Sequence, residues 1–354
     1  MKKLLFALIA ITGLVLTGCS KDENGENGNT NGKGAITVRI EGSSKSRSLE
    51  NLSAVDSKIF NYHVYVFGAT TGILEAQATG NATNPTTITE LSSASTKKVV
   101  ILANLGVYPD VNNYSELSAA VNKINLDKQS PDAVKENGYI MTGISKNEVT
   151  VIKDNTVEER VYIERAVAKI SLESITFEPE DGHDINLLEI LGVSVQRVAP
   201  EVTLSPLKSY YTVGQQGSYH YGGIAAGSSE LQVKSYLYDD LNIGTIPYDT
   251  DSEYELGNYF LVFPNTSAEN CTLLTISAKY DDDQIYYPIK INYQDGNENT
   301  DGTFVNNNKH YKVSVTIKKL GEGTTDPEQP REEGSLDVIV EVIDWEYINQ
   351  NETW

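Results

Sequence analysis

The sequence has little of what many functional sites are built from. Its 354 residues include only 4 His, 2 Cys and 2 Trp, and its 28 Lys+Arg are outnumbered by 49 Asp+Glu, which gives a formal net charge of -21. Because a nucleic-acid binder needs a basic face for the phosphate backbone, this charge argues against one. After residues 1–18, no apolar run is long enough to cross a bilayer as a helix.

The usual catalytic and metal-binding patterns are missing as well. The histidines are too scattered along the chain to give the spacing of a zinc-ligand pair: His63, His183, His220 and His310. The sequence also has no G-x-S-x-G motif, no Walker-type loop and no H-E-x-x-H. We therefore expect a protein that is not an enzyme and that uses neither a metal ion nor a cofactor.

One segment leaves a calcium site open. Residues 295–301 carry oxygen-bearing side chains at alternate positions, as the start of a calcium-binding loop does: Asp295, Asn297, Asn299 and Asp301. The sixth position, where such a loop has Gly, is Thr300, and the twelfth, where it has Glu, is Asn306. A turn rich in Gly and Asn is therefore the favoured interpretation.

The N-terminus has the three parts of an export signal. Residues 1–18 comprise a lysine-bearing start, an apolar run over Leu4–Leu16 and a small-residue end. Cys19 follows Leu-Thr-Gly, and this pattern resembles a bacterial lipobox, in which the cysteine is acylated and the signal peptide is removed. Ser20 resembles the sorting signal of lipoproteins that reach an outer membrane. An ordinary secretory signal with an accidental cysteine is the alternative.

Lipidation of Cys19 leaves Cys271 as the one remaining thiol. A single thiol cannot form an internal disulfide framework, so stability must come from packing. Cys271 lies in a strand-like segment, and we expect a buried small apolar residue rather than a nucleophile.

What the sequence has in quantity is typical of strands and turns. It contains 27 Gly, 11 Pro and 21 Tyr, and apolar and polar residues alternate along many segments. We predict strands over 35–41, 61–67, 97–104, 139–143, 157–163, 164–172, 187–198, 231–238, 258–263, 272–280, 285–293, 310–317 and 336–345. A helix is predicted over 115–124, capped by Ser115. Asp281–Asp283 is predicted to be a hairpin tip.

The segment after Cys19 combines a tether with a strand. Residues 20–34 contain no apolar side chain and are predicted to be a flexible tether. In the strand at 35–41, Ile36, Val38 and Ile40 share one face. A small polar linker follows, with Arg47 near its end, and such a linker is accessible to a protease.

The last strand repeats the pattern of the first. Leu336–Trp345 follows a polar linker rich in Pro and Gly. Four of its aliphatic side chains share one face, spaced like those of 35–41: Leu336, Val338, Val340 and Val342. The two ends of the chain are therefore suited to fill the same kind of groove. The alternative is an ordinary last strand that pairs within its own domain.

Together these features resemble a known family. The residues that carry the resemblance are the lipobox, the 35–41 strand, the Arg47 linker, Glu164–Ile170, Asn308–Ile317, the closing strand and Asn349–Trp354. They resemble the FimA-type fimbrillins, which are major shaft subunits of type V pili in Bacteroides-like bacteria. The resemblance covers both ends and the middle of the chain, whereas residues 200–310 diverge.

The resemblance implies a fold and a course of maturation. It implies a mainly β protein with two β-sandwich-like (transthyretin-like) domains in tandem, over 48–166 and 167–354, and one or two short helices. Residues 1–18 would be the signal peptide and 19–47 a propeptide. The precursor would be a lipoprotein of the outer membrane, anchored through Cys19. An Arg-specific protease would cut between Arg47 and Ser48 and so remove the 35–41 strand.

The resemblance also implies the partners. A neighbouring copy, or a related pilin, would fill the emptied groove with its C-terminal segment 336–354, and head-to-tail repetition would build a fimbrium on the cell surface. The donor side chains would be Leu336, Val338, Val340, Val342, Trp345 and Trp354. Adhesion and biofilm formation through host or bacterial surface receptors would follow.

Other functions remain open. A fimbrial tip or anchor subunit would keep the same architecture. An anchor is expected to lack the accessible Arg47, and a tip need not donate a strand. A surface carbohydrate-binding lipoprotein would stack sugars on exposed aromatic rings, for which Tyr210, Tyr211, Tyr219 and Tyr221 are candidates.

Overall fold

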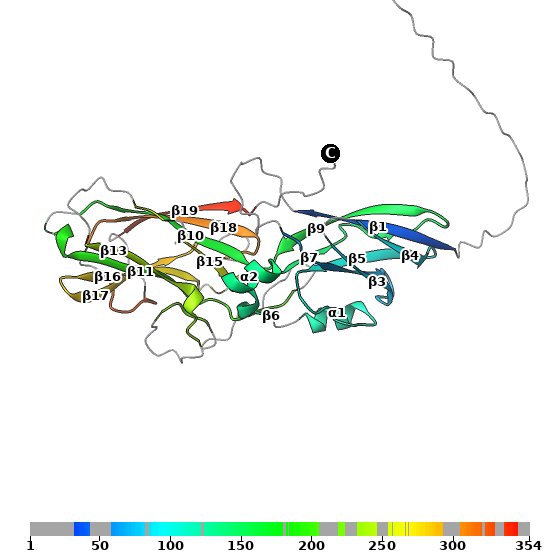
Figure 1. The fold of residues 1–354 in the computed structure, drawn as a ribbon, viewed down its shortest axis with the longest axis horizontal. Coiled ribbons are helices and arrows are strands. Elements are labelled where there is room, and N and C mark those ends of the chain that lie inside the picture. Colours follow the sequence, from blue (N-terminus) through cyan, green and yellow to red (C-terminus); the bar gives the residue numbers. More distant parts are fainter. Residues whose placement is uncertain are drawn as a thin grey trace, which may run out of the picture.

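The protein is mainly β, with two short α-helices. The computed structural model describes residues 32–42, 58–81, 85–121, 124–179, 182, 184–204, 219–223, 232–245, 254–256, 258–265, 267, 269–292, 305–320, 323–329 and 336–345. The strands form two units that lie along the long axis of the molecule (Figure 1). Strands β1 to β9, apart from β6, build the unit at one end, and β10, β11 and β13 to β19 build the unit at the other.

The first unit is an eight-stranded sheet in the order β3-β2-β5-β7-β9-β1-β4, with β8 paired to β5. Its strands are β1 (Lys33–Gly42), β2 (Tyr62–Gly68), β3 (Leu74–Gly80), β4 (Thr86–Ser92), β5 (Thr96–Ala103), β7 (Met141–Ile144), β8 (Val149–Thr150) and β9 (Thr156–Arg165). The sheet curls on itself: β2 and β4 are far apart in the strand order, yet the hydroxyls of Tyr62 and Thr86 share a hydrogen bond of 2.7 Å. A core can therefore form inside a single sheet.

The second unit has two layers. One sheet has the order β14-β10-β18-β19, with β15 paired to β10, and the other has the order β13-β11-β16-β17. The first comprises β10 (Ala168–Phe177), β14 (Tyr254–Glu255), β15 (Tyr259–Val262), β18 (Lys309–Ile317) and β19 (Leu336–Asp344). The second comprises β11 (Leu188–Gln196), β13 (Tyr238–Thr245), β16 (Leu273–Tyr280) and β17 (Asp283–Lys290). The two sheets face each other (Figure 1). Buried aliphatic side chains from both belong to one core, as in a β-sandwich.

The short helical segments confirm part of the prediction. They are α1 (Tyr114–Ala120), α2 (Pro131–Asn137), η1 (Leu126–Gln129), η2 (Ile185–Leu187) and η3 (Ser235–Leu237). The N-cap of α1 is Asn113, whose side chain accepts a hydrogen bond from the Glu116 amide; the prediction of Ser115 as the cap was wrong. Helix α2 was not predicted, although Ser130 before Pro131 is a typical helix start.

Most of the predicted strands are confirmed, and the differences have physical causes. The Asp281–Asp283 hairpin is confirmed, with Asp281 and Asp282 at positive φ between β16 and β17. The prediction of a strand over 231–238 was wrong, because η3 occupies 235–237 and β13 begins only at Tyr238. Strand β4 was missed because a bulge places its buried residues, Ile88 and Leu91, three positions apart.

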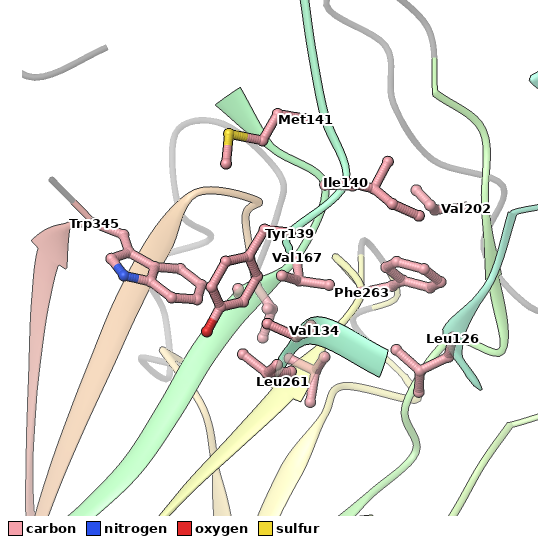
Figure 2. Close-up of a cluster of buried hydrophobic side chains, with 14 of the residues drawn as sticks. Leu126, Val134, Tyr139, Ile140, Met141, Val167, Val202, Leu261, Phe263 and Trp345 are labelled. Carbon is pink, nitrogen blue, oxygen red and sulfur yellow. The ribbon is translucent and has the colours of Figure 1, made fainter. Parts of the chain in front are cut away.

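The two units are joined by one continuous stretch of chain, a short ladder and a shared apolar cluster. Strand β9 is the last strand of the first sheet along the chain and ends at Arg165. Strand β10, the first strand of the next sheet, begins at Ala168. A short ladder between β6 (Ile124–Asn125) and β12 (Glu201–Val202) also links the units. Figure 2 shows apolar side chains from both units in one cluster, among them Val134 and Tyr139 from the first and Leu261 and Phe263 from the second. The junction is therefore a packed interface.

Candidate functional site

The strand that the sequence marks as removable lies inside the first sheet. Strand β1 runs parallel to β9 and antiparallel to β4, so both of its edges carry ladder hydrogen bonds. Ile36 and Val38 are fully buried, and Ile40 packs against the same core while partly exposed. Fully burying an aliphatic side chain contributes about 1.5–3 kcal/mol, so Ile36 and Val38 together hold β1 with roughly 3–6 kcal/mol of gross burial energy.

The position of β1 decides what its loss would leave behind. Within the described part of the chain, β4 pairs with no strand other than β1, and β9 pairs with β7 on its opposite edge. Without β1, the facing edges of β9 and β4 would carry unpaired backbone groups beside an apolar floor. Such an edge is a template for another strand. We call this space the β1 slot: the gap between β9 and β4 that β1 occupies.

The solvent face of β1 carries a short charge ladder. Arg39 Nε lies 3.1 Å from Glu158 Oε1, and Arg160 Nη1 lies 2.9 Å from Glu41 Oε1. The Tyr162 hydroxyl also hydrogen-bonds with the Glu41 carboxylate, which raises the pKa of that hydroxyl. These contacts are exposed, so each adds little stability. Because each contact joins one particular pair of residues, these contacts favour one register of β1 along β9 over the others.

One carboxyl group lies on the inner face of the slot. Glu159 is directly opposite Val38 in the β1–β9 ladder, between inward-facing residues of β9, and it is only partly exposed. Burial raises the pKa of its carboxyl above the ordinary value of 4.5. Burial therefore disfavours the charged form in the folded chain relative to the unfolded chain, so ionisation of this carboxyl costs stability as pH rises.

We expect Glu159→Gln to stabilise the uncleaved chain at neutral pH. Because the folded-state pKa of Glu159 is raised, its contribution to stability is complete below the ordinary pKa and is lost as pH rises through the raised one. The advantage of the variant is thus expected to vanish as pH falls below 4.5. Thermal unfolding of both proteins across this range measures it. Glu158→Gln, on the solvent face, is the control; an equal gain there would contradict the assignment.

The candidate donor strand lies at the edge of the second unit. Strand β19 pairs antiparallel with β18 and forms the end of its sheet. Leu336 and Val340 pack against the core while partly exposed, whereas Val338 is 38% exposed and Ile339 is 71% exposed. Among the described residues, β19 is thus held on one edge only and by fewer buried side chains than β1. In this structure it is paired within its own unit, as the sequence left open.

The end of β19 is held more firmly than its middle. Trp345 is only 2% exposed, and its ring lies 4.8 Å from that of Tyr139, edge to face (Figure 2). The Arg165 guanidinium lies 4.5 Å from the Trp345 ring and donates a hydrogen bond of 2.8 Å from Nη1 to the Trp345 carbonyl. The Trp345 amide donates to the Asn308 carbonyl at 3.1 Å. Trp345 therefore anchors the last strand at the junction of the two units.

The structure separates the residues that the sequence singled out. Strands β1 and β19 belong to different sheets, so the two ends of the chain do not share a groove within one molecule. Val342 pairs with Tyr311 in the ladder. Several predicted sites lie outside the described residues: Cys19, Arg47, Ser48, Trp354 and the 295–301 segment. Their roles stay predictions.

Two features of the site were not visible in the sequence. One is β4, the second wall of the β1 slot, and the other is the burial of Trp345 against Tyr139 and Arg165. Arg165 lies in the predicted strand over 164–172 and in the segment Glu164–Ile170 that carries the resemblance, but neither indicates that its side chain is buried. An arginine in a strand is usually exposed, so its burial had no sequence signal.

The structure also bears on other kinds of site. Tyr219 and Tyr221, candidates for sugar stacking, are buried and cannot offer an exposed ring face; Tyr210 and Tyr211 lie outside the described residues. Cys271 is a buried free thiol, as expected, and burial raises its pKa. Among the residues with described positions there is no cluster of three His, Cys, Asp or Glu suited to a metal ion. No helix in that part of the chain is long and apolar enough to cross a membrane.

Comparison with known protein families gives matches to both units. The family model described as major fimbrial subunit protein (FimA) matches residues 35–178. The model described as FimA-like major fimbrial subunit protein, C-terminal domain, matches residues 216–345. Together the two models span well over half of the chain, and each includes one of the strands discussed above.

Individual proteins match over the full length. The chain is 25% identical over 411 aligned residues to the major fimbrium subunit FimA type-5 of Porphyromonas gingivalis, covering 100% of both chains. It is 22% identical over 413 residues to a type-2 subunit of the same organism, again over 100% of both. Among solved structures, a fimbrilin from Porphyromonas gingivalis W83 superposes with a TM-score of 0.63 at 17% identity, covering 91% of this chain and 99% of the other. That superposition shows a shared fold.

Proposed function

Since the chain belongs to the FimA family of major fimbrial subunits, we propose that it is a shaft subunit of a cell-surface fimbrium that polymerises by strand exchange. The family consists of structural subunits rather than enzymes. The observation that carries the proposal is the setting of β1, a two-sided interior strand that begins at Lys33, within the last residues of the predicted tether, and ends at Gly42, before the linker with Arg47.

The proposed maturation starts from a lipoprotein. Export removes residues 1–18, and fatty acyl chains on Cys19 hold the precursor in the outer membrane. In the precursor, β1 fills its own slot. An Arg-specific protease then cuts between Arg47 and Ser48, in the small polar linker that follows β1. Arg39 is protected from the same protease because it lies within the β1 ladder.

Cleavage acts as the switch because it changes how β1 is attached. While β1 is covalently joined to the chain, its effective concentration at the slot is high, and a strand from another molecule cannot compete. After the cut, β1 dissociates as a free peptide, and its loss exposes the edges of β9 and β4. The slot then accepts a strand in trans by adding it to both ladders.

The proposed donor is the segment 336–354 of a neighbouring subunit. Two observations support β19 as its first part: it lies at a sheet edge, and its burial is weaker than that of β1. To be donated, β19 must leave β18, and Trp345 must leave Tyr139 and Arg165. Each subunit would then give one strand and receive one at a different surface. Such a heterologous contact does not close, so it makes a filament.

Cleavage of the purified precursor tests the proposal. An Arg-specific protease is expected to yield a chain that begins at Ser48, followed by ladders of SDS-resistant oligomers. Arg47→Ala should abolish both products, while the control Lys45→Ala should keep both. N-terminal mass analysis and electrophoresis are the measurements. Monomer that persists after complete cleavage at Arg47 would overturn the proposal.

A further inference from the structure

We propose that the donor strand enters the β1 slot in the direction and register of β1 itself, with Gly334 in the place of Gly34 and Glu341 in the place of Glu41. The inference rests on the proposed strand exchange and specifies how a second copy of this chain is recognised. Two contacts of β1, one steric and one electrostatic, carry it independently. Both belong to residues that the slot retains after β1 is gone.

The steric contact is at Gly34. A β-carbon at this position would lie 2.3 Å from the backbone carbonyl oxygen of Ile152 and 2.7 Å from Val151 Cγ1. The Ala35 amide donates a hydrogen bond to the Asn155 carbonyl at 2.9 Å, which holds this part of β1 against the turn before β9. Because the nearest atom belongs to backbone, it cannot move aside as a flexible side chain would. Any strand that fills the slot in this way needs glycine here.

The C-terminal segment offers a glycine at the matching place. Gly334 precedes Leu336 by two residues, as Gly34 precedes Ile36. Setting one on the other brings the three inward side chains of β1 onto aliphatic counterparts: Ile36 onto Leu336, Val38 onto Val338 and Ile40 onto Val340. Ala35, which is buried, is replaced by the similarly small Ser335. The volumes therefore match at Ile36 and Val38, and the one methylene group lost at Ile40 is at a side chain that is only partly buried.

The electrostatic contact is at Glu41. In the precursor this carboxylate lies 2.9 Å from Arg160 Nη1 and hydrogen-bonds with the Tyr162 hydroxyl. The same alignment of the two segments places Glu341 at this position. The incoming strand therefore restores the contact with Arg160 and Tyr162 that is lost when β1 leaves. Asp337 takes the place of Thr37, beside Glu158, and Ile339 takes the place of Arg39, so the ion pair of Arg39 with Glu158 is not rebuilt. Both side chains of that pair are exposed, so this loss and the new repulsion are small.

Other placements lose these contacts. A shift that moves the donor two residues forward puts Leu336 where Gly34 was, so its side chain would overlap the Ile152 carbonyl. A shift two residues the other way puts Gly334 at the Ile36 position and leaves a cavity in the floor. A donor in the reverse direction brings residues from 335–354 to the tight position, and this segment contains no glycine.

Disulfide scanning tests the register. In β1, Thr37 and Thr87 face each other across the ladder, with their hydroxyls 2.9 Å apart, so Thr37→Cys with Thr87→Cys in the uncleaved chain is the positive control. Three further chains carry Thr87→Cys together with Ser335→Cys, Asp337→Cys or Ile339→Cys. After cleavage, assembly and mild oxidation, only the Asp337→Cys chain is expected to give covalent ladders on boiling in SDS without reductant.

The outcomes separate the register from strand exchange. Polymers that cross-link through Ser335→Cys or Ile339→Cys would overturn the register and leave the proposed function standing. Chains that stay monomeric after cleavage, wild type included, would overturn both. In a second experiment, Gly334→Val is expected to slow assembly roughly tenfold or more, because it restores the overlap at the tight position. Gly321→Val in the preceding linker is the matched control, and equal rates for the two would contradict the steric argument.

Discussion

A cleaved chain whose last strand is tied to its own sheet is expected to remain monomeric. Ser314 on β18 and Ile339 on β19 are directly opposite in the ladder, and Ile339 is 71% exposed. Cysteines at both positions should form a disulfide without entering the core. Oxidised chains then cannot release β19, so cleavage after Arg47 should expose the β1 slot without supplying a donor. Electrophoresis under non-reducing conditions should show a loss of essentially all oligomers.

Reduction of the same sample provides the control. Breaking the disulfide frees β19, and ladders are expected to appear without further protease. The single variants Ser314→Cys and Ile339→Cys should polymerise with or without oxidant, since neither can tie the strands. Polymerisation by the oxidised double variant would show that β19 need not leave β18, and the donor would have to be sought elsewhere in the chain.

Val38→Asp is expected to let the uncleaved chain assemble without protease. Val38 is fully buried and lies opposite Glu159 in the ladder, so the new carboxylate faces an apolar floor that already holds one carboxyl group. Losing the valine burial and desolvating the aspartate should together weaken the attachment of β1 by more than about 3 kcal/mol. A donor strand from another molecule, which lacks this defect, then competes successfully even against a tethered β1.

Thr37→Asp is the matched control, because it places the same side chain on the solvent face of the same strand. Hydrogen exchange of the β1 amides should rise in Val38→Asp and remain close to wild type in Thr37→Asp. Oligomers should form only in the first. If the β1 amides of the Val38→Asp variant exchange as slowly as those of wild type, the burial of Val38 does not hold β1 in the sheet. If its β1 amides exchange faster but no oligomers form, opening the slot is not sufficient for assembly.

The balance between the two strands explains why a covalent cut is needed. Strand β1 has two ladder partners and two fully buried aliphatic side chains, whereas in the described part of the chain β19 pairs with β18 alone, and its described aliphatic side chains are partly or largely exposed. The better-held strand is the one that has to leave, so spontaneous exchange is disfavoured before cleavage. Trp345 adds a second restraint at the junction of the units, since releasing β19 also withdraws an indole from its contacts with Tyr139 and Arg165.

Much of this fold could be predicted because strand signals are local. In the segments around Ile36 and Leu336, aliphatic residues alternate with polar ones, and this period alone places three or four side chains on one face. Both segments are strands in the structure. Strand β4 escaped prediction because its bulge breaks the period between Ile88 and Leu91. Helix α2 escaped because a helix of 7 residues shows little more than its Ser130-Pro131 start.

The scarcity of histidine, cysteine and basic residues, the apolar alternation at both ends and the position of Arg47 were determined by the sequence alone, since each is a property of neighbouring residues. Only the tertiary structure decided that β1 lies between β9 and β4, that Glu159 faces inward opposite Val38, and that Trp345 is buried against Arg165. These contacts join residues far apart in the chain, from 50 to 180 positions in the pairs Thr37–Thr87 and Arg165–Trp345. No local period encodes them, because they depend on which strands become neighbours when the chain closes its core.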